Sequence, residues 1–129
     1  MNSEGKFLIQ QRAMTKKYFP GIWDITCGAA LAGEASLDAA IRETKEELGL
    51  DVSSFDTSFI GTSHCYDCVN HVYLFKGSFE LADLTLQKEE VMNVKLVNAT
   101  ELLELIENSE FKDLNYLKMI TEYLDKHAL

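Results

Sequence analysis

The sequence has few of the features that mark secreted, fibrous or membrane proteins. Its 129 residues include one proline and three cysteines. An odd cysteine count without a secretory signal is typical of free thiols in a reducing compartment. No apolar run approaches the roughly 20 residues that cross a bilayer. The amino end, MNSEGKFLIQQR, lacks a basic stretch followed by an apolar one. These absences favour a cytoplasmic protein that does not enter a membrane.

Basic residues are also scarce, because 12 lysines and arginines stand against 21 aspartates and glutamates and leave a net charge of −9. Such a chain repels the phosphate backbone of nucleic acid and anionic membranes. A small phosphorylated ligand is compatible with this charge if metal ions lie between it and the acids. With 47% hydrophobic residues and no repeat or linker, residues 1–129 suit a single globular domain.

The order of apolar and polar residues predicts a mixture of strands and helices. Apolar residues recur at helical spacing from Leu37 to Leu48, and Gly49 stops that helix. Asn98 followed by Glu101 is a capping-box pattern at the start of another helix. The order predicts an α/β or α+β sandwich, with strands at 6–12, 22–26, 57–63, 71–79 and 91–97 and helices at 34–48, 98–108 and 111–126.

The first predicted strand begins abruptly. Residues 2–5, NSEG, resemble a hairpin turn with a strand after it and none before it. Either the fold begins here or a preceding strand is missing. In the second case we expect strand 6–12 to have an unprotected edge.

The segment from Gly28 to Leu50, GAALAGEASLDAAIRETKEELGL, concentrates acids on one helix. Glu43 and Glu47 lie one turn apart on the same side, and Glu46 flanks them. Like charges at this spacing destabilise a helix, whereas a divalent cation turns the same carboxylates into ligands. Mg²⁺ prefers hard oxygen ligands and keeps sites for phosphate oxygens. The helix therefore predicts a metal that neutralises a diphosphate. A solvated acidic helix face is the alternative interpretation.

Residues around these acids support the metal interpretation. The planar fork of Arg42 can hold carboxylates in a fixed orientation. Glu34 stands just before the helix, where an acid favours the positive end of the helix dipole. Gly28 and Gly33 let the preceding loop bend tightly and bring its backbone near a ligand.

The fixed glycines, glutamates and arginine of this segment resemble the Nudix box, G-x5-E-x7-R-E-U-x-E-E-x-G-U with U aliphatic, from Gly28 to Leu50. Thr44 is the one departure, a polar residue where an aliphatic one is usual. The resemblance implies an α/β/α sandwich around a mixed sheet. It also implies metal-dependent hydrolysis of a nucleoside diphosphate linked to some group X, or of a related diphosphate, by water attack on phosphorus.

The same resemblance implies the residues that perform this reaction. Glu43, Glu46 and Glu47 would bind Mg²⁺ or Mn²⁺ or act as the base, and the backbone carbonyl of Cys27 would join the metal. A late glutamate outside the box is often a further ligand or base. Glu90 is our first candidate for that role, with the adjacent Glu89 as the second and a solvated turn as the alternative.

A second resemblance covers Phe7 to Leu50. The stretches FLIQQR and TKKYFPGIWD are similar to the isopentenyl-diphosphate isomerase branch of the superfamily. There, a cysteine before the box glycine acts as acid and base, and Cys27 holds that place. The isomerase's metal-binding histidine is replaced by Ala29, and its catalytic Glu-x-Glu by Val69-Asn70-His71. We expect hydrolysis, with isomerisation through Cys27 or a non-catalytic diphosphate-binding module as the alternatives.

Four further residues are candidates for substrate binding. Arg12, Lys16 and Lys17 could hold the substrate's phosphates or form a basic surface patch. Trp23 could stack on a base or pack in the core. The expected partner is a small-molecule diphosphate of open identity, and dimers are common among similar proteins.

A zinc site is a separate hypothesis. His64, Cys65, Cys68 and His71 have the residue types that bind zinc, in a segment where a hairpin loop is expected. A single Cys-x-x-Cys pair is a weak signal for such a site.

Overall fold

The structure is a computed structural model that describes residues 1–17, 19–25, 30–65, 68–108 and 114–127. None of the described helices combines the length and the apolar character needed to cross a bilayer. Each predicted strand and helix is present, with ends that differ by a few residues. The elements in chain order are β1 (Phe7–Arg12), β2 (Trp23–Asp24), α1 (Ser36–Leu48), β3 (Asp56–Cys65), β4 (Cys68–Lys76), a 3₁₀ turn (Leu81–Asp83), β5 (Val91–Val97), α2 (Ala99–Glu107) and α3 (Leu114–Lys126).

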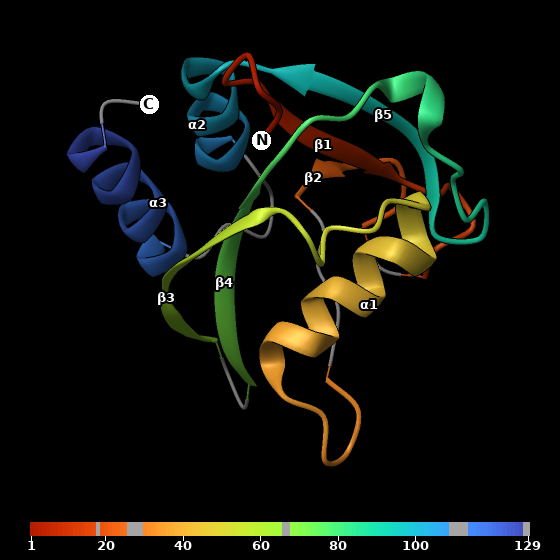
Figure 1. Ribbon diagram of the computed structural model, residues 1–129, viewed down its shortest axis with the longest axis horizontal. Helices are drawn as coiled ribbons and strands as arrows, with labels where there is room; N and C mark the ends of the chain where they lie inside the picture. The colour runs from red at the N-terminus through yellow and green to blue at the C-terminus, as the bar shows by residue number, and fades with distance from the viewer. Residues whose placement is uncertain (18, 26–29, 66–67, 109–113, 128–129) are drawn as a thin grey trace.

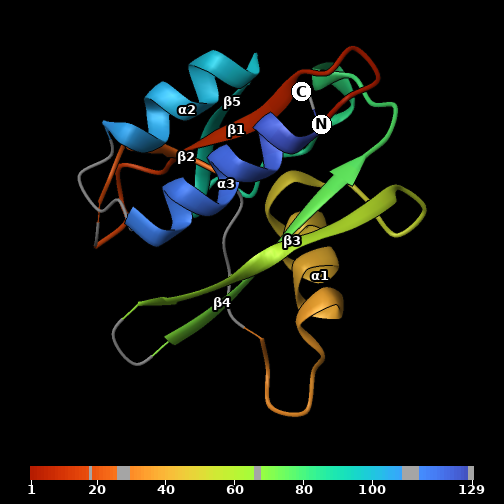
Figure 2. The ribbon, with the colours of Figure 1, turned by 90° about the vertical axis from the view of Figure 1, so that its left-hand side faces the viewer.

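The strands form two sheets, one with the order β2-β1-β5 and one made of the hairpin β3-β4. Helix α1 lies on one side of the hairpin, and α2 and α3 lie together on the other side (Figures 1 and 2). The predicted sandwich of helices and sheets is confirmed. One detail differs, because every pairing between the described strands is antiparallel. Parallel neighbours need a crossover within one sheet, and here α1 leads from one sheet to the other.

Strand β1 is the inner strand of its sheet. It pairs with β5 from Phe7 to Arg12 and with β2 at Gln10 and Gln11. On the β2 side the pairing covers Gln10 and Gln11, and no described strand pairs with Phe7–Ile9 there, so the expected unprotected edge stays a prediction for that part of the strand. Sequence periodicity predicts that a segment is a strand but carries no information about its distant partners. The predicted turn before β1 is present, because the backbone N–H groups of Glu4 and Lys6 donate to Asn2 Oδ1 at 3.0 and 2.9 Å.

The hairpin β3-β4 is longer than predicted. Its ladder runs up to the pair Cys65 and Cys68 and includes the pair Thr62 and His71. Much of the segment expected to be a loop is therefore paired strand. The side chains of both cysteines and of His64 lie outside the described part of the structure, so the zinc site stays a prediction.

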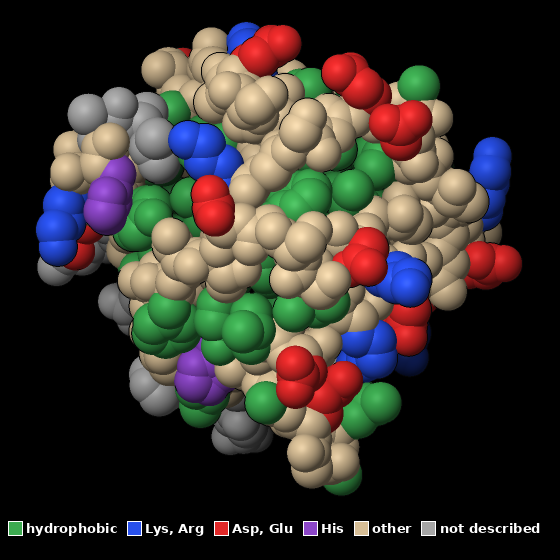
Figure 3. All heavy atoms as spheres, viewed as in Figure 1, with side chains coloured by type: hydrophobic (Ala, Val, Ile, Leu, Met, Phe, Trp, Pro, Cys, Tyr) green, Lys and Arg blue, Asp and Glu red, His purple; other side chains and the backbone are tan. Residues whose placement is uncertain are grey.

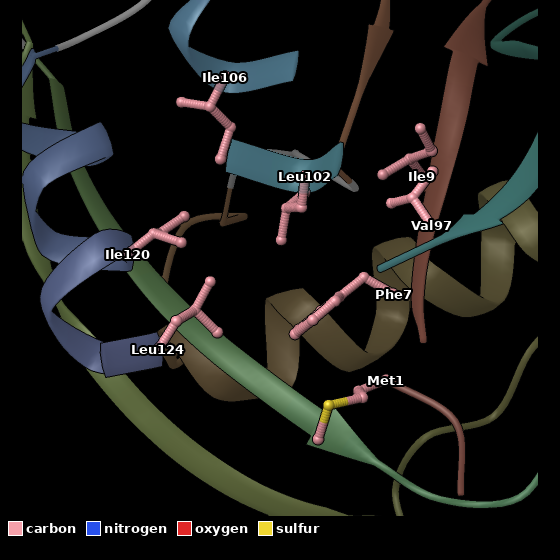
Figure 4. Close-up of a cluster of buried hydrophobic side chains, with 8 residues drawn as sticks. All are labelled: Met1, Phe7, Ile9, Val97, Leu102, Ile106, Ile120 and Leu124. Carbon is pink, nitrogen blue, oxygen red and sulfur yellow. The ribbon is translucent and has the colours of Figure 1, made fainter. Parts of the chain in front are cut away.

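The core lies between the sheet β2-β1-β5 and the two carboxy-terminal helices. Figure 4 shows apolar side chains from β1, β5, α2 and α3 that point toward one another. Phe7 and Ile9 of β1 belong to this cluster, at 7% and 1% exposed. Burying each such side chain contributes about 1.5–3 kcal/mol. Because side chains alternate along a strand, this packing turns Gln10 and Arg12 to the opposite face of β1.

Helix α1 explains the one departure from the box pattern. The Thr44 hydroxyl donates to the backbone carbonyl of Ala40 at 2.7 Å, so this polar side chain is buried with its hydrogen bond satisfied. The helix ends at Gly49, whose φ of 68° is left-handed and whose N–H donates to the Lys45 carbonyl at 2.9 Å. Glu47 and Leu48, in the last turn, are buried.

Replacing Gly49 by alanine is expected to destabilise the fold. A Cβ at this position would lie 3.0 Å from both Cβ and N of Thr85, in a left-handed conformation that side chains rarely adopt. We expect Gly49→Ala to lower the free energy of unfolding by about 1–3 kcal/mol, measured by urea denaturation. Gly5→Ala is the matched control, because Gly5 has a φ of 78° and open space around its Cβ position. Equal losses in the two variants would contradict a role for the Thr85 contact.

Candidate active site

A small polar pocket of about 320 Å³ lies where α1, β1 and the segment before β5 meet. Five of its lining residues are acids and two are cations. Figure 3 shows acidic and basic side chains interleaved on the face of the molecule over α1. The lining residues are Gln10, Arg12, Lys16, Asp24, Ile25, Glu43, Glu46, Glu47, Gln87 and Glu90.

Backbone hydrogen bonds bring these distant segments together. The N–H of Ala13, just after β1, donates to the carbonyl of Glu90 at 3.0 Å. The N–H of Gln87 donates to the carbonyl of Glu47 at 2.9 Å. The segment before β5 is thus attached both to β1 and to the end of α1. Glu90 and the box acids therefore face the same pocket, although more than 40 residues separate Glu90 from α1.

Arg42 holds the acids on the outer side of α1. Its guanidinium makes two bonds to Glu34, Nε to Oε2 at 2.9 Å and Nη2 to Oε1 at 3.0 Å. Its Nη1 lies 3.1 Å from an oxygen of Glu43 and 3.1 Å from one of Glu46. Glu34 also accepts from the N–H of Leu31 at 3.0 Å. The hydrogen bonds from Arg42 lower the pKa of Glu34, which keeps this carboxylate charged.

Glu47 is the most deeply placed of the box acids, at 7% exposed. Its Oε2 accepts a hydrogen bond from Nε2 of Gln10 at 3.2 Å. Burial raises the pKa of Glu47 to about 7, although the hydrogen bond from Gln10 lowers it. The negative charges of Glu43 and Glu90 raise this pKa further. Burial also raises the pKa of Asp24 to about 6, while the N–H of Ile25 and the charge of Arg12 lower it. A cation in the pocket would relieve the cost of ionising these two acids.

Glu90 is the late glutamate that lies in the pocket. Its Oε2 lies 2.5 Å from Nζ of Lys16 in an ion pair. The adjacent Glu89 is exposed and does not line the pocket. Between these two candidates, the geometry therefore favours Glu90.

The other predicted site residues have different positions. Arg12 and Lys16 line the pocket, whereas Lys17 and Trp23 do not. Nζ of Lys95 lies 4.4 Å from the centre of the Trp23 ring, and the ring packs against the core cluster, which favours the core interpretation of Trp23. Cys27 and Gly28 lie outside the described residues.

Sequence reasoning missed Ile25 and three polar residues of the pocket. Gln10 and Asp24 lie opposite each other on β1 and β2, and Gln87 lies three residues before Glu90. The sequence shows only their positions, a glutamine two residues before Arg12 and an aspartate four residues before Gly28. Neither pattern shows that these residues meet the helix.

The donor set of the pocket fits a hard divalent cation, because its acids supply carboxylate oxygens in a polar recess. As the side chains stand, no three of the described histidine, cysteine, aspartate and glutamate residues converge on one metal position. In the structure Lys16 pairs with Glu90, and Arg42 pairs with Glu43 and Glu46. The carboxylate oxygens around the pocket are nevertheless the donors that Mg²⁺ or Mn²⁺ would take.

A larger cavity of about 550 Å³ lies beside this pocket and shares Ile25 and Glu43 with it. Its lining is mostly apolar and includes core residues such as Leu48 and Val52. Its greater size does not make it the reactive site. The smaller pocket holds the concentration of acids that diphosphate chemistry needs.

Comparison with known proteins identifies the family to which this arrangement belongs. The Nudix domain family model matches residues 1–118. An uncharacterised Nudix hydrolase of Listeria innocua is 37% identical over 94% of this chain and 72% of its own length. An isopentenyl-diphosphate Delta-isomerase of Cutibacterium acnes is 49% identical over 78% of this chain and 57% of its own length. The chain thus spans only part of the length of each relative.

The fold agrees with these matches. A crystal structure of a C. elegans Ap4A hydrolase has a TM-score of 0.71 with this chain, at 21% identity, over 95% of this chain and 87% of that one. The family match and the Nudix hydrolase relatives support the enzyme class expected from the sequence, a hydrolase of phosphoric anhydride bonds. The chain belongs to the Nudix family.

Proposed function

We propose that this chain hydrolyses a small nucleoside diphosphate linked to a group X, or a related diphosphate, with Mg²⁺ or Mn²⁺ as cofactor. The observation that carries the proposal is the pocket in which Glu43, Glu46 and Glu47 of the box meet Glu90. A diphosphate and five acids repel each other, so a divalent cation is needed between them. The same cation would polarise the phosphorus and lower the pKa of a bound water.

The chain's own residues would divide the remaining tasks. Glu43, Glu46, Glu90 and the Cys27 carbonyl would hold the metal, and Glu47 would hold metal or take the proton of the attacking water. The water oxygen forms a bond to phosphorus while the anhydride P–O bond breaks and its electron pair leaves with the second product. Arg12 and Lys16 line the pocket and would bind the phosphate oxygens. Arg42 would orient the outer acids through its bonds to Glu34, Glu43 and Glu46.

Isomerisation of isopentenyl diphosphate is the second candidate, because an isomerase is 49% identical over 78% of the chain. That reaction would use Cys27 to move a proton on carbon, and no P–O bond would break. The complete box and the five acids around the pocket favour hydrolysis. A Cys27→Ala variant that keeps its activity would remove isomerisation through this residue.

A substrate panel tests the proposal. The purified protein is incubated with Mg²⁺ and ADP-ribose, nucleoside triphosphates, diadenosine tetraphosphate, isopentenyl diphosphate or inorganic pyrophosphate, and products are separated by chromatography. We expect cleavage of at least one diphosphate linkage that stops when EDTA is added. Binding of a diphosphate without turnover would support the non-catalytic module, and an isomerised product would support the second candidate. Either result would overturn hydrolysis.

A further inference from the structure

Gln10 is a polar side chain in an unusual place. It lies in the inner strand β1, between Asp24 of β2 and Val94 of β5, and is only 7% exposed. Strands on both sides fix its backbone, so its side chain extends from a rigid position. Because Phe7 and Ile9 occupy the core face of β1, Gln10 points to the face where α1 lies.

The side chain of Gln10 contacts one box acid. Nε2 donates to Oε2 of Glu47 at 3.2 Å, across 37 positions of sequence. Both residues are 7% exposed, so water competes little for this bond. The backbone carbonyl of Glu47 is held as well, by the N–H of Gln87 at 2.9 Å. Glu47 is thus attached to β1 through its side chain and to the segment before Glu90 through its backbone.

An amide is a suitable partner for an acid that must keep its charge. The amide of Gln10 is neutral, so it orients Glu47 without cancelling the negative charge that a metal or a proton would meet. A lysine or arginine in its place would neutralise Glu47, as Lys16 and Arg42 neutralise their own partners. The bond also engages only one of the two carboxylate oxygens, which leaves Oε1 for another ligand.

We propose that Gln10 is a positioning residue that fixes the carboxylate of Glu47 for metal binding and for water attack. This inference rests on the proposed function, because it assigns Gln10 a role through a box acid of that site. Groups that orient a metal ligand typically change metal affinity or activity by about 10- to 100-fold when they are removed.

The test compares Gln10→Met with Gln11→Met. Methionine keeps the length of the side chain and removes the donor. Gln11 is the adjacent residue on β1, and its amide donates instead to the carbonyl of Gly21 at 3.0 Å. Binding of Mn²⁺ to each purified protein is measured without substrate, from the electron paramagnetic resonance signal of the free ion. We expect Gln10→Met to weaken Mn²⁺ binding about 10-fold or more and Gln11→Met to leave it within about 2-fold.

A double-mutant cycle separates positioning from a general loss of structure. If Gln10 acts through Glu47, Gln10→Met should weaken Mn²⁺ binding little further in a Glu47→Gln background. Equal Mn²⁺ affinity in Gln10→Met and wild type would overturn the proposal, as would an additive loss in the double variant. If Gln10→Met does not fold, Gln10→Asn is used instead. Asparagine keeps the amide group but is too short to reach Glu47. Unchanged Mn²⁺ affinity, or an additive loss in the double variant, would again overturn the proposal. Metal binding without cleavage of any diphosphate would instead count against the proposed function alone.

Discussion

Glu47→Gln is expected to reduce turnover of a diphosphate substrate by about 100-fold or more. Glutamine has nearly the size of glutamate but neither ligates a cation as strongly nor takes a proton from water. Removing a general base usually costs about 10²–10⁴-fold in rate, and losing a metal ligand acts in the same direction. Glu47 is the most buried of the three acids Glu43, Glu46 and Glu47. A molecule of bulk water therefore cannot easily take over its role as metal ligand or base. The measurement is kcat under saturating Mg²⁺.

Glu89→Gln is the matched control for this variant. It makes the same change of charge and size at an exposed residue that does not line the pocket. We expect its kcat to stay within about 2-fold of the wild type, because exposed charges contribute little beyond their own contacts. Full activity in Glu47→Gln, or equal losses in both variants, would contradict the assignment of the site.

The metal-free protein is expected to lose stability as the pH rises, and Mg²⁺ is expected to restore it. The pKa of Glu47 is raised from 4.5 to about 7 and that of Asp24 from 3.8 to about 6. Between about pH 4 and pH 6 these two acids therefore bind more protons in the folded state than in the unfolded state, so stability falls as the pH rises through this range. Above about pH 6 the amino group of Met1 opposes this trend, because burial lowers its pKa to about 6 and it loses its proton first in the folded state. At about 1.4 kcal/mol per pKa unit, and allowing for relaxation of the pocket, the expected loss is on the order of 2–4 kcal/mol.

Thermal unfolding checks this prediction. In EDTA, the melting temperature should be several degrees higher at pH 4.5 than at pH 6. Added Mg²⁺ should raise it more at pH 8, because the ligands must be deprotonated to bind a cation. Glu47→Gln should flatten the profile and raise the melting temperature in EDTA at pH 8. A flat wild-type profile, or a larger effect of Mg²⁺ at pH 4.5, would contradict this prediction.

Local sequence patterns predicted the elements well because each pattern has a local cause. Gly49 marks the end of α1, since a left-handed residue is needed there. The Asn98–Glu101 capping box is present at the start of α2, with Asn98 Oδ1 accepting from the N–H of Glu101 at 2.8 Å. These features depend on residues three or four positions apart. The sequence states them directly.

Long-range features could not be predicted in the same way. The sequence places Glu43, Glu46 and Glu47 on one helix, but it does not show that Glu47 becomes buried. Glu47 is buried where the end of α1 meets Gln10 of β1 and the backbone of Gln87. The length of the β3-β4 ladder, which includes the Cys65–Cys68 pair, likewise depends on pairing between strands. The acid helix was thus predictable, whereas its neutral partner Gln10 was visible only in three dimensions.

The most direct test of the account is to follow the oxygen of the attacking water. The best substrate of the panel is cleaved in ¹⁸O-labelled water with Mg²⁺, and both products are analysed by mass spectrometry. Water attack on phosphorus predicts one ¹⁸O atom in a phosphoryl product and none bound to carbon, with no reaction in EDTA. Label on carbon, or an isomerised substrate with its diphosphate intact, would contradict metal-dependent hydrolysis at this site.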